Sequence, residues 1–161
     1  MYWVAWEIDR ECVEFTKNKF PAVRHRGEFT KDDIDDLMHE LDQIDPDHEA
    51  EILFCAGPPC PDFSRIRGDK APGKAGPEGK KFTQFTEFHE QVRHRCNRQV
   101  RSVVEKVVFQ DPREADGFST ALHCTPVVCD SADFGTIRRP RLWWTQVAWD
   151  STPAWTHNAM G

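Results

Sequence analysis

The strongest constraint on this chain is a mostly apolar run, Glu51–Ala56, that stops at a glycine and two prolines. The run predicts a buried strand. It cannot extend through Gly57–Pro59, because proline fixes its φ angle and lacks the N–H that a strand ladder needs. Cys60 is therefore expected on a stiff turn just past the carboxyl end of a strand, the edge where α/β proteins bind ligands. Cys60 is the leading candidate nucleophile; a buried, unreactive cysteine is the alternative.

Apolar runs and amphipathic segments alternate along the 161 residues, enough chain for one domain with a single core. The alternation indicates an α/β fold with a mostly parallel sheet and crossover helices. The expected strands are residues 2–9, 23–29, 51–56, 106–112, 126–130 and 141–149. The expected helices are residues 10–19, 30–44 (with Thr30 as the cap), 82–104 and 115–123. Residues 65–81 are expected to form a long loop, either a lid over a substrate or an insert without function.

The net charge of -6 argues against a chain that is basic all over and binds nucleic acid for that reason. The charges are unevenly distributed, however. Residues 28–49 hold ten acids and one lysine, whereas residues 65–106 hold eleven Lys or Arg and five acids. The basic segment follows Cys60 directly and, with Arg138–Arg141, suits a polyanion such as DNA or RNA. Two solvated helix faces of opposite sign would explain the same pattern.

No apolar run approaches the length of a membrane helix, so no membrane partner is expected. Six cysteines without framework spacing indicate reduced thiols and an intracellular location. His89, His94 and Cys96 lie close in sequence, but no second ligand pair has zinc-finger spacing, so no metal site is expected. The oligomeric state does not follow from the sequence.

The first expected strand, residues 2–9, ends in the acids Glu7 and Asp9. In a nucleotide-binding α/β fold, an acid at a strand tip can bind ribose hydroxyls, and Trp6 or Ile8 could pack on a purine. The acids could equally belong to the start of the next helix, where the helix dipole stabilises negative charge.

Four segments in this order resemble motifs of the cytosine-C5 DNA methyltransferases. Gly57–Ser64 reads GPPCPDFS and resembles the family's GPPCQxFS nucleophile loop, with Pro61 where glutamine is usual. Residues 6–9 are similar to the strand end that binds the ribose of S-adenosylmethionine, and residues 27–29 resemble the next motif, whose acid contacts the adenine amino group. Residues 132–141 resemble the DYGxPQxRxR segment, whose arginines line the pocket for the flipped base.

The resemblance implies a Rossmann-like, S-adenosylmethionine-dependent methyltransferase fold. It implies S-adenosyl-L-methionine as the cofactor, with cofactor-binding residues Glu7, Ile8, Glu28, Phe29 and Pro59. It implies DNA as the partner and, as catalytic residues, Cys60, Asp111, Arg139 and Arg141.

The chain departs from the family pattern in several segments. The ENV motif, whose glutamate contacts cytosine N3, is replaced by Gln110–Pro112, so Asp111 is the expected stand-in. The PQ pair before the arginines reads Ile137-Arg138. The glycine-rich first motif, the target-recognition region and the last two motifs have no counterpart. We therefore expect residues 1–150 to be a partial catalytic domain truncated at both ends, followed by an irregular tail at residues 151–161.

The implied function is that of a DNA (cytosine-5) methyltransferase. It transfers a methyl group from S-adenosylmethionine to C5 of a flipped-out cytosine through a covalent Cys60 adduct. RNA is an alternative substrate, since RNA cytosine-C5 methyltransferases share this loop. Another alternative is an inactive remnant that at most binds nucleic acid. Cys55 and Cys60 are too far apart for a CxxC redox enzyme. The implied location is intracellular, and nuclear in a eukaryote.

Overall fold

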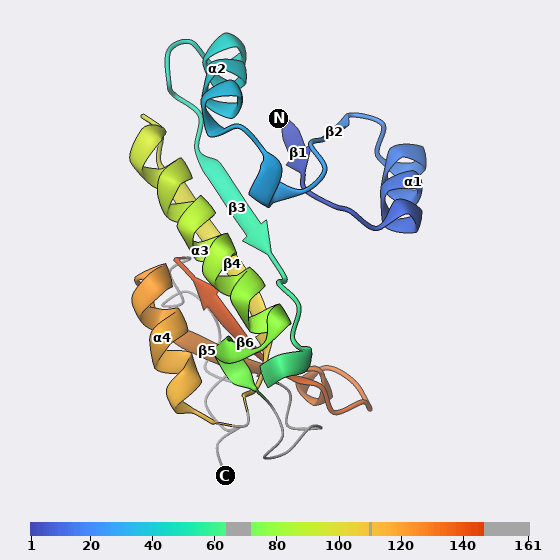
Figure 1. Cartoon of the computed structure of the whole chain (residues 1–161). Helices are drawn as coiled ribbons and strands as arrows, with labels where there is room; N and C mark the ends of the chain where they lie inside the picture. The colour runs from blue at the N-terminus through green and yellow to red at the C-terminus, as the bar shows by residue number, and fades with distance from the viewer. Residues whose placement is uncertain (64–71, 110, 147–161) are drawn as a thin grey trace.

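The computed structural model describes residues 1–63, 72–109 and 111–146 (Figure 1). These residues form a mixed α/β structure with four α-helices and six strands. Short 3-10 helices lie at Phe29–Lys31, Pro61–Phe63, Gly73–Ala75 and Ser131–Asp133. In chain order the main elements are β1 (Trp3–Ala5), α1 (Arg10–Lys19), β2 (Val23–His25), α2 (Ile34–Ile44), β3 (Ile52–Ala56), α3 (Pro77–Arg95), β4 (Val100–Val107), α4 (Arg113–Leu122), β5 (Pro126–Asp130) and β6 (Pro140–Thr145).

The strands form two sheets. β1 and β2 make a parallel pair, and the larger sheet has the order β3-β4-β6-β5. β3 and β4 are parallel, whereas β6 runs antiparallel to both β4 and β5. β3, β4 and β5 therefore share one direction, and their carboxyl ends meet the start of β6 at one edge of the sheet.

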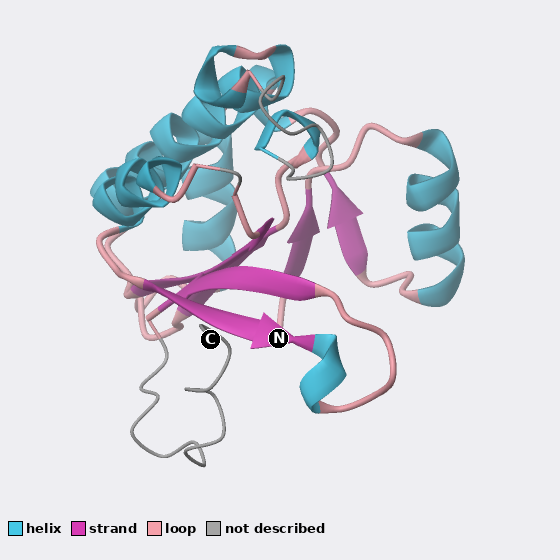
Figure 2. Cartoon of the chain, turned by 90° about the horizontal axis from the view of Figure 1, so that it is seen from below, coloured by secondary structure: helices cyan, strands magenta, loops and turns pink. Residues whose placement is uncertain are grey.

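The core lies between the larger sheet and the helices α3 and α4, which cover one of its faces (Figure 2). Alternate residues of β4 are buried against these helices, as the two-residue period of a strand requires. The core is dominated by aromatic rings: Phe54, Phe63, Phe82, Phe85, Phe88, Phe109, Phe118 and Trp144 are all buried.

Trp6 joins the small sheet to the large one. Its ring stacks on Phe54 of β3, with the centroids 5.9 Å apart, and meets the edge of Phe88 of α3 at 5.4 Å. Its indole Nε1 donates a hydrogen bond to Asp32 Oδ2 at 2.6 Å. One side chain thus contacts β3, α3 and the segment that leads into α2.

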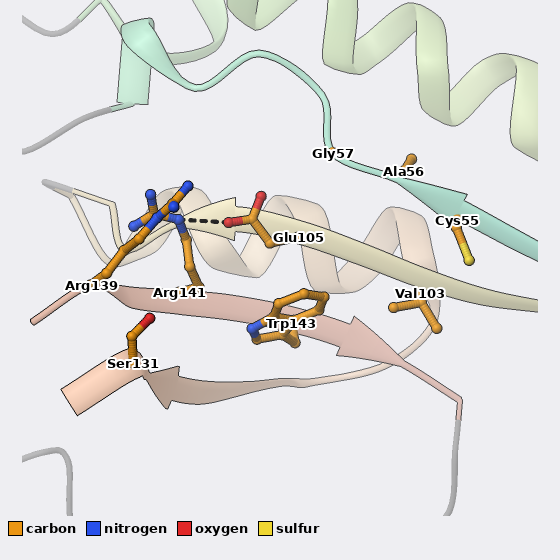
Figure 3. Close-up of a pocket in the computed structure, with 9 residues that line it drawn as sticks. All are labelled: Cys55, Ala56, Gly57, Val103, Glu105, Ser131, Arg139, Arg141 and Trp143. Carbon is orange, nitrogen blue, oxygen red and sulfur yellow. Dashed lines mark ion pairs between the residues drawn. The ribbon is translucent and has the colours of Figure 1, made fainter. Parts of the chain in front are cut away.

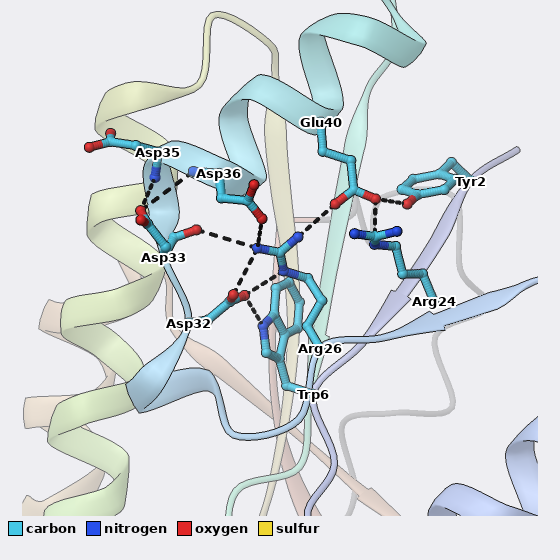
Figure 4. Close-up of polar contacts among 9 residues, drawn as sticks. All are labelled: Tyr2, Trp6, Arg24, Arg26, Asp32, Asp33, Asp35, Asp36 and Glu40. Carbon is cyan, nitrogen blue, oxygen red and sulfur yellow. Dashed lines mark hydrogen bonds and ion pairs between the residues drawn. The ribbon is translucent and has the colours of Figure 1, made fainter.

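Arg26 lies at the centre of an ion-pair network between the small sheet and α2 (Figure 4). Its guanidinium contacts Asp32 at 2.7 Å, Glu40 at 2.6 Å and Asp36 at 2.9 Å. The side chains of Arg26 and Asp32 are only 6% and 8% exposed. Burial raises the pKa of Asp32, but the hydrogen bonds from Arg26 and Trp6 outweigh it and leave that pKa below its ordinary value.

Several predicted elements match the structure. The helix at residues 10–19 and the strand at 126–130 have the expected bounds, and β3 differs from its prediction by one residue. The cap of α2 was wrongly predicted, because Asp33 and not Thr30 accepts hydrogen bonds from the first-turn amides, those of Asp35 and Asp36. Thr30 lies instead in a 3-10 turn.

The predicted helix at 82–104 was wrong at both ends. The helix α3 ends at Arg95, and residues 100–107 form β4, which contains four β-branched valines. α3 begins at Pro77, so the end of the predicted loop at 65–81 is helical. The early part of that loop, residues 65–71, lies outside the described residues, as do the tail at 151–161 and the end of the predicted strand 141–149.

We predict that stability falls in acid because of His89. Its Nε2 lies 2.5 Å from Ser102 Oγ, and burial, helped by the charge of Arg93, lowers its pKa to about 4. In the unfolded chain this histidine binds a proton near its ordinary pKa of 6.5, so the stability that His89 contributes at neutral pH is lost as the pH falls toward 4. Urea unfolding should show a loss of about 2 kcal/mol between pH 7.5 and pH 5 from this group. His89→Gln should flatten the profile, and His94→Gln, on the exposed side of α3, should not; equal profiles for all three proteins would contradict the assignment.

We predict that Arg26→Leu destabilises the chain by about 3 kcal/mol, because it leaves the buried Asp32 carboxylate without its ion-pair partner. Arg24 also pairs with Glu40, at 2.7 Å, but its side chain is 55% exposed. Arg24→Leu is therefore the matched control and should cost less than about 1 kcal/mol. If the two variants unfold at the same urea concentration, the Arg26 ion pairs contribute no more to stability than the exposed Arg24 pair does.

Candidate active site

Cys60 lies on the turn that follows β3, as the sequence predicts. The chain leaves β3 at Ala56 and enters a 3-10 helix, Pro61–Phe63. The Cys60 side chain is half-buried, and its Sγ donates to the carbonyl oxygen of Pro58 at 3.4 Å. The thiol is thus fixed by its own turn, while part of it stays accessible.

Lys106 of β4 is buried beneath this turn. The residue is 0% exposed, and its Nζ donates a hydrogen bond to the carbonyl oxygen of Pro59, the residue before Cys60. The same Nζ lies 4.7 Å from the ring centroid of Phe63. The turn is therefore joined to the neighbouring strand by a buried amine.

Asp62 joins the same turn to α3. It is 1% exposed, and its Oδ2 accepts hydrogen bonds from the amides of Glu78 at 2.8 Å and Gly79 at 3.2 Å. These amides lie in the first turn of α3, where N–H groups lack helical partners and favour a negative charge. A Cβ at Gly76 would lie 2.2 Å from this carboxylate, which explains the glycine there.

The two predicted arginines lie at the same edge of the sheet, on its other face. Arg141 of β6 pairs with Glu105 of β4 at 2.6 Å, and the backbone N–H of Arg139 donates to Asp130 Oδ1 at 2.6 Å. Both side chains line an open depression of about 630 Å³ (Figure 3). Its lining residues are Cys55, Ala56, Gly57, Val103, Glu105, Ser131, Arg139, Arg141 and Trp143.

Cys60 does not line this depression, although its turn begins at Gly57 on the rim. The depression lies over the sheet face turned away from α3 and α4, whereas the buried Lys106 points to the helix side. Cys55 was expected in the core but is exposed, because odd-numbered residues of β3 face away from the helices. The structure thus brings the nucleophile turn and the arginines to one edge without joining them in one cavity.

Asp111 forms its ion pair within its own segment. Arg113 holds the carboxylate with its Nη2 at 2.7 Å and its Nε at 3.0 Å, and the backbone N–H of Arg113 donates at 3.0 Å. These bonds lower the pKa of Asp111. The carboxylate is therefore ionised at neutral pH: it can accept a hydrogen bond from an amine but cannot donate a proton.

Four of the five predicted cofactor residues follow the strands of the small parallel sheet, and the fifth, Pro59, lies on the Cys60 turn. Glu7 follows β1, and its Oε1 accepts from the amides of Ile8 and Asp9, both at 2.8 Å. Ile8 is 71% exposed. Asp9 is the cap of α1 and accepts from the amide of Cys12, so the helix-start alternative applies to Asp9 and not to Glu7.

The second motif shows a similar division. The hydrogen bonds from Lys31 and then Thr30 lower the pKa of Glu28, whose carboxylate is engaged within its own turn. Phe29 packs on Phe88 of α3 at 5.8 Å and so belongs partly to the core. Pro59 contributes its carbonyl to the Lys106 contact. Of this set, Ile8 and Pro59 are exposed, whereas Glu7, Glu28 and Phe29 are half-buried.

Sequence reasoning missed Lys106 and Asp62 as residues that support the site. Lys106 is a charge at the head of the apolar run Val107–Phe109, and this was a signal that could have been used. Asp62 carried no such signal, because its partners in α3 are 16 and 17 residues away in sequence.

No protein-family model matches this chain, and no curated protein sequence matches it. Among the described residues, no helix has the length and apolar character needed to cross a membrane.

We predict that Gly76→Ala destabilises the chain by about 1–3 kcal/mol, because the new methyl group would displace Asp62 from the start of α3. Gly135→Ala is the control, since a Cβ there would lie 3.6 Å from its nearest neighbour, an ordinary contact. Thermal unfolding of the two variants should separate them by several degrees. If the two variants unfold at the same temperature, the position of Asp62 does not depend on the absence of a side chain at Gly76.

Proposed function

We propose that this chain is a DNA (cytosine-5) methyltransferase domain with a Rossmann-like fold. The observation that carries the proposal is the position of Cys60. It lies on a proline-stiffened turn at the carboxyl end of β3, held from below by Lys106 and from the side by Asp62. A nucleophile held in this way is pre-positioned for attack.

The two-sheet arrangement also supports the proposal. β1–β2 and β3-β4-β6-β5 are separate sheets joined by Trp6, so the small parallel sheet lies beside the sheet that carries the Cys60 turn. The acids Glu7 and Glu28 follow the two parallel strands of the small sheet, the edge suited to a nucleotide. The Glu7 carboxylate and the exposed Ile8 fit a ribose and a purine ring. S-Adenosylmethionine bound there would supply the methyl group.

The chemistry begins at Cys60. The target cytosine must leave the stack, because C6 is not accessible within a duplex. The Cys60 thiolate forms a bond to C6, and the electron pair of the C5–C6 double bond moves toward N3, which makes C5 nucleophilic. After C5 has accepted the methyl group it loses its proton, and the Cys60–C6 bond breaks to restore the double bond and release the thiolate.

The polar residues of the same edge have distinct tasks in this scheme. Asp111, held ionised by Arg113, accepts a hydrogen bond from the exocyclic amine of cytosine. Arg139 and Arg141 attract the phosphate backbone and the base. The proposal makes DNA the partner and the cell interior the location, in a eukaryote the nucleus.

One observation favours the second candidate, an inactive remnant. A protonated acid at N3 would offset the charge that develops there, and the ion pair with Arg113 withholds that proton from Asp111. In this case the chain would keep the fold and a nucleic-acid surface without turnover. RNA is the alternative substrate for an active chain, and the methyl-transfer assay below includes it as a separate substrate.

Calorimetric titration of the chain with S-adenosylmethionine tests the cofactor-binding part of the proposal. We expect binding in the micromolar range and a loss of at least tenfold in Glu7→Ala. Glu11→Ala is the matched control: it removes an exposed acid from the first turn of α1, leaves the Asp9 cap in place and should bind as the parent does. Binding that is equal in parent and Glu7→Ala would remove Glu7 from the site.

A methyl-transfer assay tests the chemical half. The chain is incubated with methyl-labelled S-adenosylmethionine and either a cytosine-containing DNA duplex or an RNA of the same sequence. We expect label in DNA, none with Cys60→Ser, and normal activity with Cys129→Ser. Label in RNA alone would identify the RNA enzyme, and cofactor binding without any label would favour the inactive remnant.

A further inference from the structure

Lys106 is a buried charge that core packing does not require. It lies in β4 between Val104 and Phe109, both of which are buried apolar residues, and its own exposure is 0%. A methionine would fill the same volume without the cost of removing an ammonium group from water. The surroundings of Lys106 therefore need an explanation.

The Lys106 amine is directed at the Cys60 turn. Within the described parts of the chain its Nζ has one hydrogen-bond acceptor, the carbonyl oxygen of Pro59, next to Cys60 in sequence. The faces of aromatic rings surround it, with Nζ 4.7 Å from the centroid of Phe63 and 5.7 Å from that of Phe118. Aromatic faces stabilise a cation but accept no proton from it.

We propose that Lys106 is a positioning residue that fixes the turn carrying Cys60 and stabilises the Cys60 thiolate with its ammonium charge. On ionisation the thiol proton leaves to solvent, Lys106 keeps its three protons, and the new negative charge forms on the residue after Pro59, whose carbonyl oxygen binds the ammonium group. The role of Cys60 as a nucleophile rests on the proposed function, but the effect of Lys106 on its ionisation does not.

The charges around Lys106 support this assignment. Burial lowers the pKa of Lys106, and neighbouring negative charges oppose that lowering, with Cys60 first. The others, in decreasing order, are Glu105 on the same strand, Asp62 on the turn and Glu78 on α3. Asp62 is engaged by the amides of α3, Glu105 by Arg141 and Glu78 by Lys81, so each of these acids has a second partner.

The pH dependence of Cys60 alkylation tests the proposal. An ordinary thiol has a pKa of about 8.5 and is mostly protonated at neutral pH, so the rate with iodoacetamide follows the thiolate fraction. The rate is measured from pH 5 to 10 by mass spectrometry of the Cys60 peptide, with the Cys12 and Cys55 peptides of the same sample as internal standards. No nucleic acid or cofactor is present.

Three variants separate charge from hydrogen bond. Lys106→Met removes both, Lys106→Gln keeps an N–H donor for Pro59 without the charge, and Lys106→Arg keeps the charge. We expect Lys106→Met and Lys106→Gln to raise the half-maximal pH of Cys60 alkylation by about one unit, which slows the reaction about tenfold at pH 7. Lys106→Arg should leave the half-maximal pH near the parent value. The alkylation rates of Cys12 and Cys55 should follow pH in the same way in all three variants as in the parent.

If Lys106→Met shifts the half-maximal pH and Lys106→Gln does not, only the hydrogen bond to Pro59 matters, and the thiolate role is overturned. No shift with either would overturn the whole proposal. Because a buried substitution can impair folding, Glu78→Gln tests the same charge balance from a partly exposed site. With one negative charge fewer near Lys106, the half-maximal pH should fall, and a rise would contradict the proposal. Absence of methyl transfer alongside these shifts would reject the proposed enzyme and leave the role of Lys106 intact.

Discussion

The aromatic contact of Trp6 is the interaction on which the arrangement of the described chain most depends. The two sheets share no backbone hydrogen bonds, so side chains must fix their relative position. Trp6 does so by packing on Phe54 and Phe88 while its indole N–H holds Asp32. Asp32 in turn binds Arg26, which reaches α2. The distance between the acids of the small sheet and the Cys60 turn is thus set by one ring and one buried ion pair.

The sequence predicted the parts of the fold whose signals are local. A buried apolar run bounded by Gly57–Pro59 predicted β3, and the segment between the acids of the first strand and Phe20-Pro21 predicted α1. It failed where two elements follow each other closely. Between Arg95 and Val100 a helix gives way to a strand within five residues, and the valines of β4 fit a helical stripe as well as a strand. Only the pairing of β4 with β3 and β6 decides between them.

The candidate site was predictable to a similar degree. The position of Cys60 at a strand end followed from the prolines, and the arginines at the start of β6 reached the same edge as expected. The ionisation of these groups was not predictable, because it depends on neighbours distant in sequence or hidden in a turn. Lys106 binds the carbonyl of Pro59, which lies 47 positions earlier in the sequence. Asp111 forms an ion pair with Arg113 that no motif indicates.

The helix α1 contributes no buried residue to the core, and Phe15 on it is 60% exposed. It is held by its Asp9 cap and its connections to β1 and β2, so its amides should exchange with solvent well before those of β3 and β4. Glu7 therefore lies at a boundary between a rigid ring, Trp6, and a weakly held helix. A ligand that binds Glu7 would have to order that helix, and part of its binding free energy would be spent on the entropy of doing so.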